Sequence, residues 1–214
     1  MNLYAEKPDD YFAKARLEIQ PLLANNWNAP CRALEVGCGE GHTLEWLKQS
    51  GFCSWVAGVE PYAKRHPSNT SIDQFESIDI EAQLPEIPLA SLDLILCLDV
   101  LEHLNNPWMT MQNLAKFLKP GGHWIISVPN IRNYHILIDL AFRGRFHYTD
   151  SGILDRTHLR FFTRSSLTEM VEGAGADVNT ILGSDSHRWQ KKLLNKMGLG
   201  DLIAKQLLLS ATQK

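Results

Sequence analysis

The sequence predicts an α/β fold in which helices cover both faces of a mostly parallel β-sheet. Three observations predict it. Between residues 31 and 129, short apolar runs alternate with segments of helical periodicity. Leu92–Leu98 is apolar at nearly every position, as a strand covered on both faces must be. The first apolar run ends in a glycine-rich turn, Gly37–Gly41, and open α/β sheets bind their ligands at such strand ends.

The first half of the chain carries three expected strands and two expected helices. Residues 11–24 have apolar side chains at helical spacing, with Pro21 inside the pattern, and predict a leading amphipathic helix. A second helix is expected over 41–50. Residues 62–71 are polar and are expected to form a frayed helix and loop. The expected strands are 33–36, 55–59 and 75–80.

In the second half the alternation continues and then loosens. We expect a strand at 92–98, a helix over 108–118 that stops at Pro120-Gly121-Gly122, and a strand at 123–128. Residues 130–162 are aromatic, basic and irregular. Beyond them we expect a helix over 165–173, a helix or excursion over 186–199, and strands at 177–182 and 205–212. Strand–helix–strand crossovers imply a parallel sheet.

Composition excludes several classes of protein. The 214 residues suit one large domain, and 44% hydrophobic with 21% charged residues exclude a disordered chain. A net charge of −3 argues against a nucleic-acid partner. No apolar run could span a bilayer, and the N-terminus lacks a signal-peptide core. We therefore expect no stable membrane insertion. The four cysteines form no CxxC pair, so we expect reduced thiols and a cytoplasmic protein.

Acidic residues follow three successive expected strands. The turn after the first strand reads GxGxG, whereas a dinucleotide turn reads GxGxxG, and Glu35 just before it would repel a phosphate. Glu60 ends the second strand about 20 residues later, where a carboxylate can accept both ribose hydroxyls. Asp79 lies at the end of the third expected strand, where its carboxylate could accept a hydrogen bond from an adenine amino group. The glycine-rich turn, Glu60 and Asp79 at three successive strand ends favour a nucleoside ligand, and the glycine spacing argues against a pyrophosphate.

These motifs resemble those of the class I S-adenosyl-L-methionine-dependent methyltransferases. The resemblance rests on EVGCGEG, GVEP, IDIE, LDLILCLDVLEHL and LKPGG, and covers roughly residues 11–182. DVLEHL and LKPGG…SVPN resemble the branch of ubiquinone-biosynthesis O-methyltransferases. DRTHLRFFT, at 155–163, resembles small bacterial methyltransferases of cell-surface saccharide synthesis. The resemblance implies a Rossmann-like, doubly wound, mostly parallel seven-stranded sheet with an antiparallel last strand.

The resemblance also implies S-adenosyl-L-methionine as cofactor, with S-adenosyl-L-homocysteine as product, and assigns ten residues to it. The methionine portion would lie against Glu35, Gly37, Cys38 and Gly39. The nucleoside would be held by Glu60 with Pro61 nearby, and by Asp79 and Ile80. The sulfonium and the methionine amino group would lie beside Leu98 and Asp99.

Methyl transfer is an in-line displacement, and a hydroxyl acceptor also needs a base. His103 and His158 are the candidate catalytic residues, because a histidine within hydrogen-bond reach can take the proton. The alternatives are a packing or capping role for His103 and a backbone-bonded lid residue for His158. A metal-assisted variant would use both with Glu102, but no HxH or HExxH spacing supports it, so we expect no metal site.

We expect a helical cap at 1–30 and a methyltransferase domain at 31–214, with 130–162 as an acceptor-side lid. The aromatic and arginine side chains of 130–162 favour a small acceptor that is acidic or phosphorylated. Alternatively, this segment is an amphipathic lid packed on the core, or it touches a membrane surface together with 199–209. The apolar side chains concerned are Ile136, Leu137, Ile138, Leu140, Ala141 and Phe142.

The leading hypothesis is therefore a methyltransferase acting on a hydroxyl oxygen of a small sugar, saccharide-linked or phenolic acceptor. A nicotinamide-dependent oxidoreductase on the same kind of sheet is one alternative, although the glycine spacing and DVLEHL argue against it. A non-catalytic module that retains the cofactor pocket is another. The chain is expected to be a monomer or a homodimer.

Overall fold

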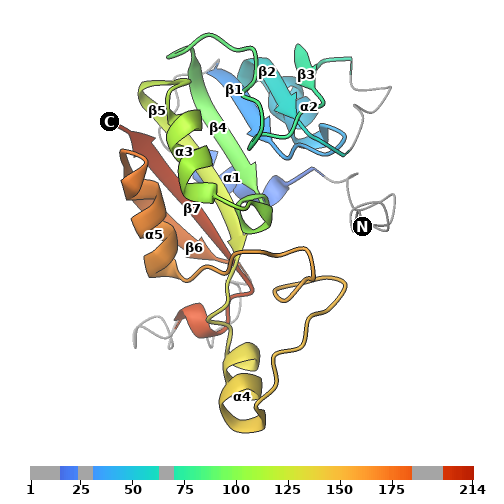
Figure 1. Cartoon of the computed structure of the whole chain (residues 1–214). Coiled ribbons are helices and arrows are strands. Elements are labelled where there is room, and N and C mark those ends of the chain that lie inside the picture. Colours follow the sequence, from blue (N-terminus) through green and yellow to red (C-terminus); the bar gives the residue numbers. More distant parts are fainter. Residues whose placement is uncertain (1–14, 24–30, 63–69, 185–199) are drawn as a thin grey trace.

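The computed structural model describes residues 15–23, 31–62, 70–184 and 200–214, and these build one seven-stranded sheet (Figure 1). The strand order is β3-β2-β1-β4-β5-β7-β6. Most of the expected cap at 1–30, much of the expected frayed helix and loop at 62–71, and the expected helix or excursion at 186–199 lie outside the described residues.

Five strands run parallel and the last strand runs against its neighbours, as expected. The parallel strands are β1 (Cys31–Val36), β2 (Cys53–Val59), β3 (Gln74–Glu76), β4 (Leu92–Leu98) and β5 (Leu118–Pro129). The strand β7 (Gln206–Gln213) is antiparallel both to β5 and to β6 (Ala176–Gly183). From β1 the chain winds outward to β3 and returns to β4 on the other side of β1. This switch point opens a crevice at the carboxyl ends of β1 and β4.

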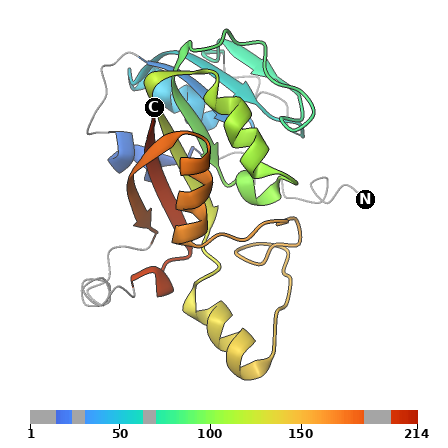
Figure 2. The ribbon, with the colours of Figure 1, turned by 60° about the vertical axis from the view of Figure 1, so that its left-hand side comes forward.

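Helices cover both faces of the sheet, which confirms the doubly wound architecture (Figure 2). On one face, a 3-10 turn (Leu17–Ile19), α1 (Gln20–Leu23) and α2 (His42–Gln49) pack through fully buried leucine and isoleucine side chains. On the other, α3 (Pro107–Ala115) and α5 (Arg164–Gly173) contribute buried leucine and methionine side chains. Pro21 lies in the first turn of α1, where its missing N–H is not needed.

Two element boundaries differ from the expectation. The third strand was expected over 75–80 but ends at Glu76, because Asp79 forms a turn instead: its carboxylate accepts from the amide of Glu81 at 2.9 Å. The helix expected over 108–118 ends at Ala115, and β5 already begins at Leu118. The Pro120-Gly121-Gly122 segment, expected to stop the helix, lies inside β5 instead. There the register between β4 and β5 shifts, and this irregularity accommodates the segment within the strand.

Residues 130–162, called the acceptor-side segment below, leave the sheet at the end of β5 and return to it. Asn130 and Phe162 form an isolated bridge, and the amide of Ile131 donates to the carbonyl of Phe162 at 3.1 Å. The segment is less irregular than expected, because it contains the ten-residue helix α4 (Tyr134–Arg143). The Asn133 side chain caps the first turn of α4, and Gly144 ends it in a left-handed conformation.

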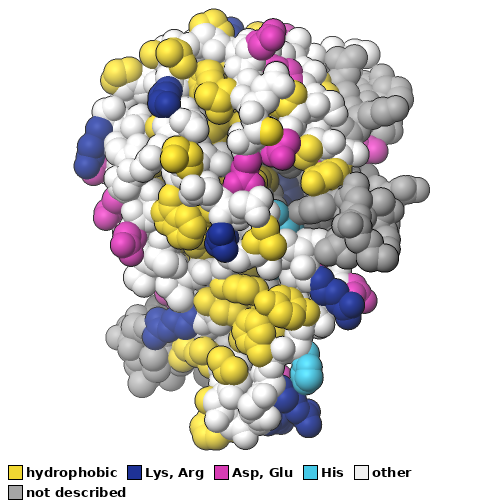
Figure 3. All heavy atoms as spheres, in the orientation of Figure 1, with side chains coloured by type: hydrophobic (Ala, Val, Ile, Leu, Met, Phe, Trp, Pro, Cys, Tyr) yellow, Lys and Arg dark blue, Asp and Glu magenta, His cyan; other side chains and the backbone are white. Residues whose placement is uncertain are grey.

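The helix α4 projects beyond the sheet (Figures 1 and 2) and none of its residues is buried. The alternative in which its apolar side chains pack on the core is therefore wrong, since the helix extends past the end of the sheet rather than over it. Figure 3 shows apolar side chains gathered over this region. The exposed ones include Leu137, Ile138, Leu140 and Phe142 of α4, and Phe146 and Tyr148.

The alternative of a membrane contact at 199–209 fails for its C-terminal part. Leu207, Leu208 and Leu209 are buried in β7, where they pack in the two core clusters of the sheet. In the part of the chain that the structure describes, we find no helix whose length and hydropathy would allow it to cross a bilayer.

Candidate active site

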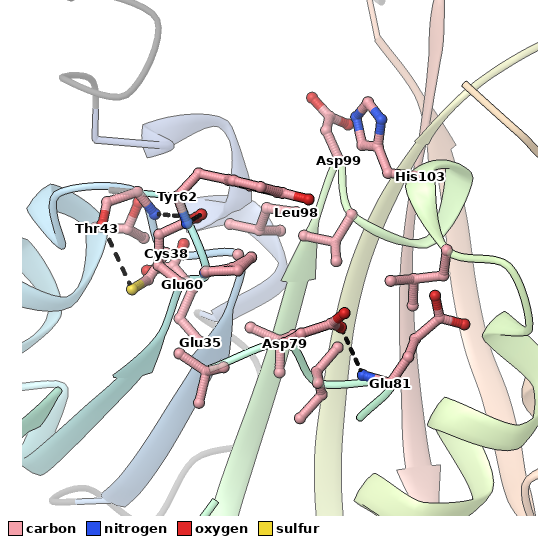
Figure 4. A pocket seen from close by; sticks show the side chains of 18 of the residues that line it. Glu35, Cys38, Thr43, Glu60, Tyr62, Asp79, Glu81, Leu98, Asp99 and His103 are labelled. Carbon is pink, nitrogen blue, oxygen red and sulfur yellow. Dashed lines mark hydrogen bonds between the residues drawn. The ribbon is translucent and has the colours of Figure 1, made fainter. Parts of the chain in front are cut away.

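A cavity of about 390 Å³ opens at the switch point of the sheet, and all ten residues expected at the cofactor line it. Figure 4 shows Cys38 and Glu60 on one side, Asp79 below, and Asp99 with His103 opposite. The expected residues that line it are Glu35, Gly37, Cys38, Gly39, Glu60, Pro61, Asp79, Ile80, Leu98 and Asp99. The sequence-based grouping therefore describes one real cavity.

The turn after β1 needs glycine at Gly37 for two reasons. The first is its φ of +69°, a left-handed conformation that side chains disfavour. The second is the close approach of Val100, because the amide of Gly37 donates to the carbonyl of Val59 at 2.8 Å and fixes the backbone there. A Cβ atom at this position would lie 2.3 Å from Cγ2 of Val100. The backbone can follow this path between β1, β2 and the end of β4 only because the side chain is missing.

Gly37→Ala is expected to destabilise the protein more than Gly51→Ala. Both glycines have positive φ, so both variants bear about 1–2 kcal/mol of backbone strain. Only Gly37→Ala adds the collision with Val100, which costs about 1–3 kcal/mol more, because a Cβ at Gly51 meets no atom within 4 Å. Denaturant unfolding measures the free energy of unfolding of both variants. Equal losses of this free energy would show that the Val100 side chain moves aside without measurable cost.

Glu60 ties the glycine-rich turn to the end of β2. Its side chain is buried, and its two carboxylate oxygens accept from the amide of Gly39 at 3.1 Å and from the amide of Tyr62 at 2.9 Å. Because these bonds span β1 and β2, the carboxylate is held at the floor of the cavity. Charge-assisted bonds of this kind are stronger than neutral ones and orient the acceptor oxygens.

Glu35 is buried beneath the turn and differs from the expectation in its charge. Burial raises the pKa of its carboxyl to about 8, against the opposing attraction of Arg16 and a hydrogen bond from Thr43. The raised pKa favours the protonated carboxyl, which weakens the repulsion of a phosphate expected from its charge. Burial likewise raises the pKa of the Cys38 thiol, which makes it a lining group rather than a nucleophile.

Asp99 forms the opposite wall, directly after β4. Its backbone takes a φ of +57°, which is rare for a residue other than glycine and marks stored strain at a site. One carboxylate oxygen accepts from the Ser127 hydroxyl at 2.7 Å. The other accepts from the Gln206 amide at 2.7 Å and lies 2.9 Å from the Arg16 guanidinium. Three distant segments therefore converge on this one carboxylate.

Sequence reasoning missed several residues of the cavity, of which Arg16 is the most informative. It precedes the first 3-10 turn, lines the cavity and is the cation nearest to Asp99. No local pattern marks it, because its place depends on how the N-terminal segment crosses the sheet. Tyr62 could have been found, since it follows Glu60-Pro61 by one residue. The other missed polar lining residues are Thr43, Glu81 and Asn105.

A second cavity of about 790 Å³ lies between the sheet and the acceptor-side segment, and it shares Asp99 and His103 with the first. Both expected catalytic histidines line it. Nδ1 of His103 lies 3.1 Å from the carbonyl of Thr157, and Nδ1 of His158 lies 2.9 Å from the carbonyl of Ile153. A carbonyl can only accept, so each Nδ1 carries the hydrogen and each Nε2 carries the lone pair.

The two histidine rings meet edge to face, with centroids 4.8 Å apart. Burial, and then the nearby His158, lower the pKa of His103 to about 4, so this ring is neutral at physiological pH. The backbone bond of His158 also fits the alternative of a structural lid residue. The geometry thus brings the two imidazole rings together, and His103 connects them to the first cavity.

Glu102 completes a group with both histidines. It is buried, and neither of its carboxyl oxygens has a hydrogen-bond partner among the residues that the structure describes. Burial raises its pKa well above the ordinary value. One ligand atom each from Glu102, His103 and His158 lie within 4.8 Å of one another. The three residues of the metal-assisted variant therefore meet although the sequence lacks metal-ligand spacing, and the absence of a metal stays a prediction.

Comparison with known proteins identifies the family. A family model described as a methyltransferase domain matches residues 9–181. A ubiquinone biosynthesis O-methyltransferase of Azoarcus sp. (strain BH72) is 28% identical over 187 residues, covering 77% of each chain. One of Coxiella burnetii (strain RSA 331 / Henzerling II) is 29% identical over 163 residues, covering 72% of this chain and 67% of that protein.

Solved structures show the same fold at lower identity. An S-adenosylmethionine-dependent methyltransferase of Mesorhizobium loti superposes with a TM-score of 0.63 at 17% identity, covering 91% of this chain and 97% of that one. The [4+2]-cyclase SpnF has a TM-score of 0.59 at 16% identity, covering 92% and 80%. The family match overturns the nicotinamide oxidoreductase alternative. With its mostly parallel seven-stranded sheet and matching domain model, the chain belongs to the class I S-adenosylmethionine-dependent methyltransferases.

Proposed function

We propose that this methyltransferase methylates a hydroxyl oxygen of a small acceptor, with the cofactor in the first cavity and the acceptor in the second. The observation that carries the proposal is that the two cavities share Asp99 and His103. A methyl donor in one and an acceptor in the other would meet at these residues, as an in-line displacement requires. The O-methyltransferase names of the relatives support oxygen as the methylated atom.

The residues of the first cavity fit S-adenosyl-L-methionine, which supplies an activated methyl group when bound. The side-chain-free turn at Gly37 is a cradle that a Cβ would fill, and the buried carboxylate of Glu60 suits ribose hydroxyls. Arg16 carries the charge to hold the methionine carboxylate, with Asp99 beside the methionine amino group. Asp79 and Ile80 would contact the adenine.

The base in this proposal is His158 or His103. Each would accept the hydroxyl proton on Nε2, while its Nδ1–H bond to a backbone carbonyl holds the ring and stabilises the resulting cation. The acceptor-side segment supplies His158 and closes the second cavity over the acceptor, which limits access of water.

S-adenosyl-L-homocysteine is expected to stabilise the protein against heat, whereas NAD is not. At about 100 times its Kd, a ligand that binds only the folded state adds about 2.7 kcal/mol. Thermal unfolding with each ligand measures this. Stabilisation by NAD alone would contradict the assignment of the first cavity. Tight binding of S-adenosyl-L-homocysteine without methyl transfer to any of a panel of sugars and phenols would favour the non-catalytic alternative.

A further inference from the structure

The second cavity carries two cationic side chains, one from each of the parts that enclose it. Arg145 follows α4 in the acceptor-side segment, and Lys205 directly precedes β7 in the sheet. Both are exposed toward solvent. Over residues 15–23, 31–62, 70–184 and 200–214, no carboxylate lies within ion-pair distance of either cation and neither side chain forms a hydrogen bond. Their charges are therefore available to a ligand.

Three of the four carboxyl groups that line the same cavity, those of Asp99, Asp139 and Asp155, are already engaged. Asp99 is held by Ser127, Gln206 and Arg16. Asp139 pairs with Arg143 at 2.5 Å, and Asp155 accepts from the Thr157 amide at 2.9 Å and hydroxyl at 2.8 Å. The Glu102 carboxyl is buried without any cation close enough to pair with it among the described residues. Among the described residues, therefore, no carboxylate of this cavity forms an ion pair with Arg145 or Lys205.

The candidate bases and the cations of this cavity are different residues of its lining. His103 lines both cavities, and its ring contacts the ring of His158, which is buried. Arg145, Lys205 and the exposed imidazole of His147 line it elsewhere, on residues that do not line the first cavity. An acceptor in this cavity could thus present its hydroxyl to a histidine and another group to a cation. The volume suits a small organic molecule.

We propose that the second cavity holds an oxyanion of the acceptor, a phosphate or a carboxylate, between Arg145 and Lys205. The guanidinium offers two parallel N–H donors to such a group, and the ammonium adds a mobile positive charge. This inference rests on the proposed function, because it names the class of acceptor for the same site. Binding would also bridge the acceptor-side segment and the sheet, and so close the cavity only when an anionic acceptor is present.

The test uses inorganic phosphate and acetate as probes, titrated at constant ionic strength into the full-length protein with and without S-adenosyl-L-homocysteine. Calorimetry and the thermal unfolding midpoint report binding. We expect saturable binding in the unaltered protein, weakened about 10-fold or more in Arg145→Met and in Lys205→Met. Stronger binding of phosphate would assign a phosphorylated acceptor, and stronger binding of acetate a carboxylate.

The matched control is Arg132→Met, which removes the same charge from the same segment at a residue that does not line the cavity. It should bind phosphate like the unaltered protein. Absence of saturable binding, or an equal loss in all three variants, would overturn the proposal. Failure to bind S-adenosyl-L-homocysteine would instead count against the proposed function, and the titration without it keeps the two failures apart.

Discussion

His158→Ala is expected to lower turnover by about 10²–10⁴-fold while leaving the affinity for S-adenosyl-L-homocysteine unchanged. The reason is its position: His158 lines the second cavity but not the first, and its Nδ1 bond to Ile153 aims the ring without touching the cofactor residues. Turnover is measured on any hydroxyl acceptor that the panel provides, and affinity by calorimetry. Parallel loss of both quantities would assign His158 to a structural role.

His103→Ala makes the informative comparison, because His103 lines both cavities and should affect turnover and cofactor affinity together. The pH profile separates the two bases further. A histidine whose pKa is lowered to about 4 keeps its lone pair as the pH falls from 7 to 5. If His103 is the base, turnover should therefore hold over that range and fall only near pH 4. His123→Ala, on β5 and outside both cavities, is the control for the loss of a histidine.

A chelator distinguishes the base from the metal-assisted variant. With histidine acting as a base, turnover should be unchanged by EDTA and by added divalent cations. Loss of turnover with EDTA and recovery with a metal ion would assign Glu102, His103 and His158 to a metal instead.

Glu60→Ala is expected to weaken S-adenosyl-L-homocysteine binding by about 2–4 kcal/mol, through the loss of charge-assisted hydrogen bonds to the ribose hydroxyls. The structure adds a second contribution, since the amides of Gly39 and Tyr62 lose their acceptor and the glycine-rich turn loses its tie to β2. Calorimetry measures the affinity, and unchanged affinity would refute the ribose assignment.

Two further variants sharpen this result. Glu60→Gln keeps one acceptor oxygen and should give an intermediate loss. Glu40→Ala removes a neighbouring acid that does not line the cavity. This variant should bind S-adenosyl-L-homocysteine with the affinity of the unaltered protein. A loss as large as that of Glu60→Ala would indicate a general electrostatic effect.

Sequence patterns were most informative where a strand is buried on both faces. Leu92–Leu98 was placed without error, because a strand inside the sheet must be apolar throughout. The edge strand β3 is short and partly exposed, so its pattern was ambiguous and its end was misplaced. Asp79 nevertheless lines the expected cavity, since the chain has to pass the same edge of the sheet whether it is strand or turn.

By itself, the sequence predicted the α/β class, and the resemblance of its motifs to a known family implied the antiparallel last strand and ten of the residues that line the first cavity. For the glycine-rich turn, Glu60 and Asp79 the physical reason is that parallel strands bring their carboxyl ends to one edge, so residues next to these ends converge on one cavity. Only the tertiary structure decided that Arg16 reaches Asp99, that α4 projects beyond the core, and that Arg145 and Lys205 line one cavity. These positions depend on the paths of long connections, which side-chain periodicity does not encode.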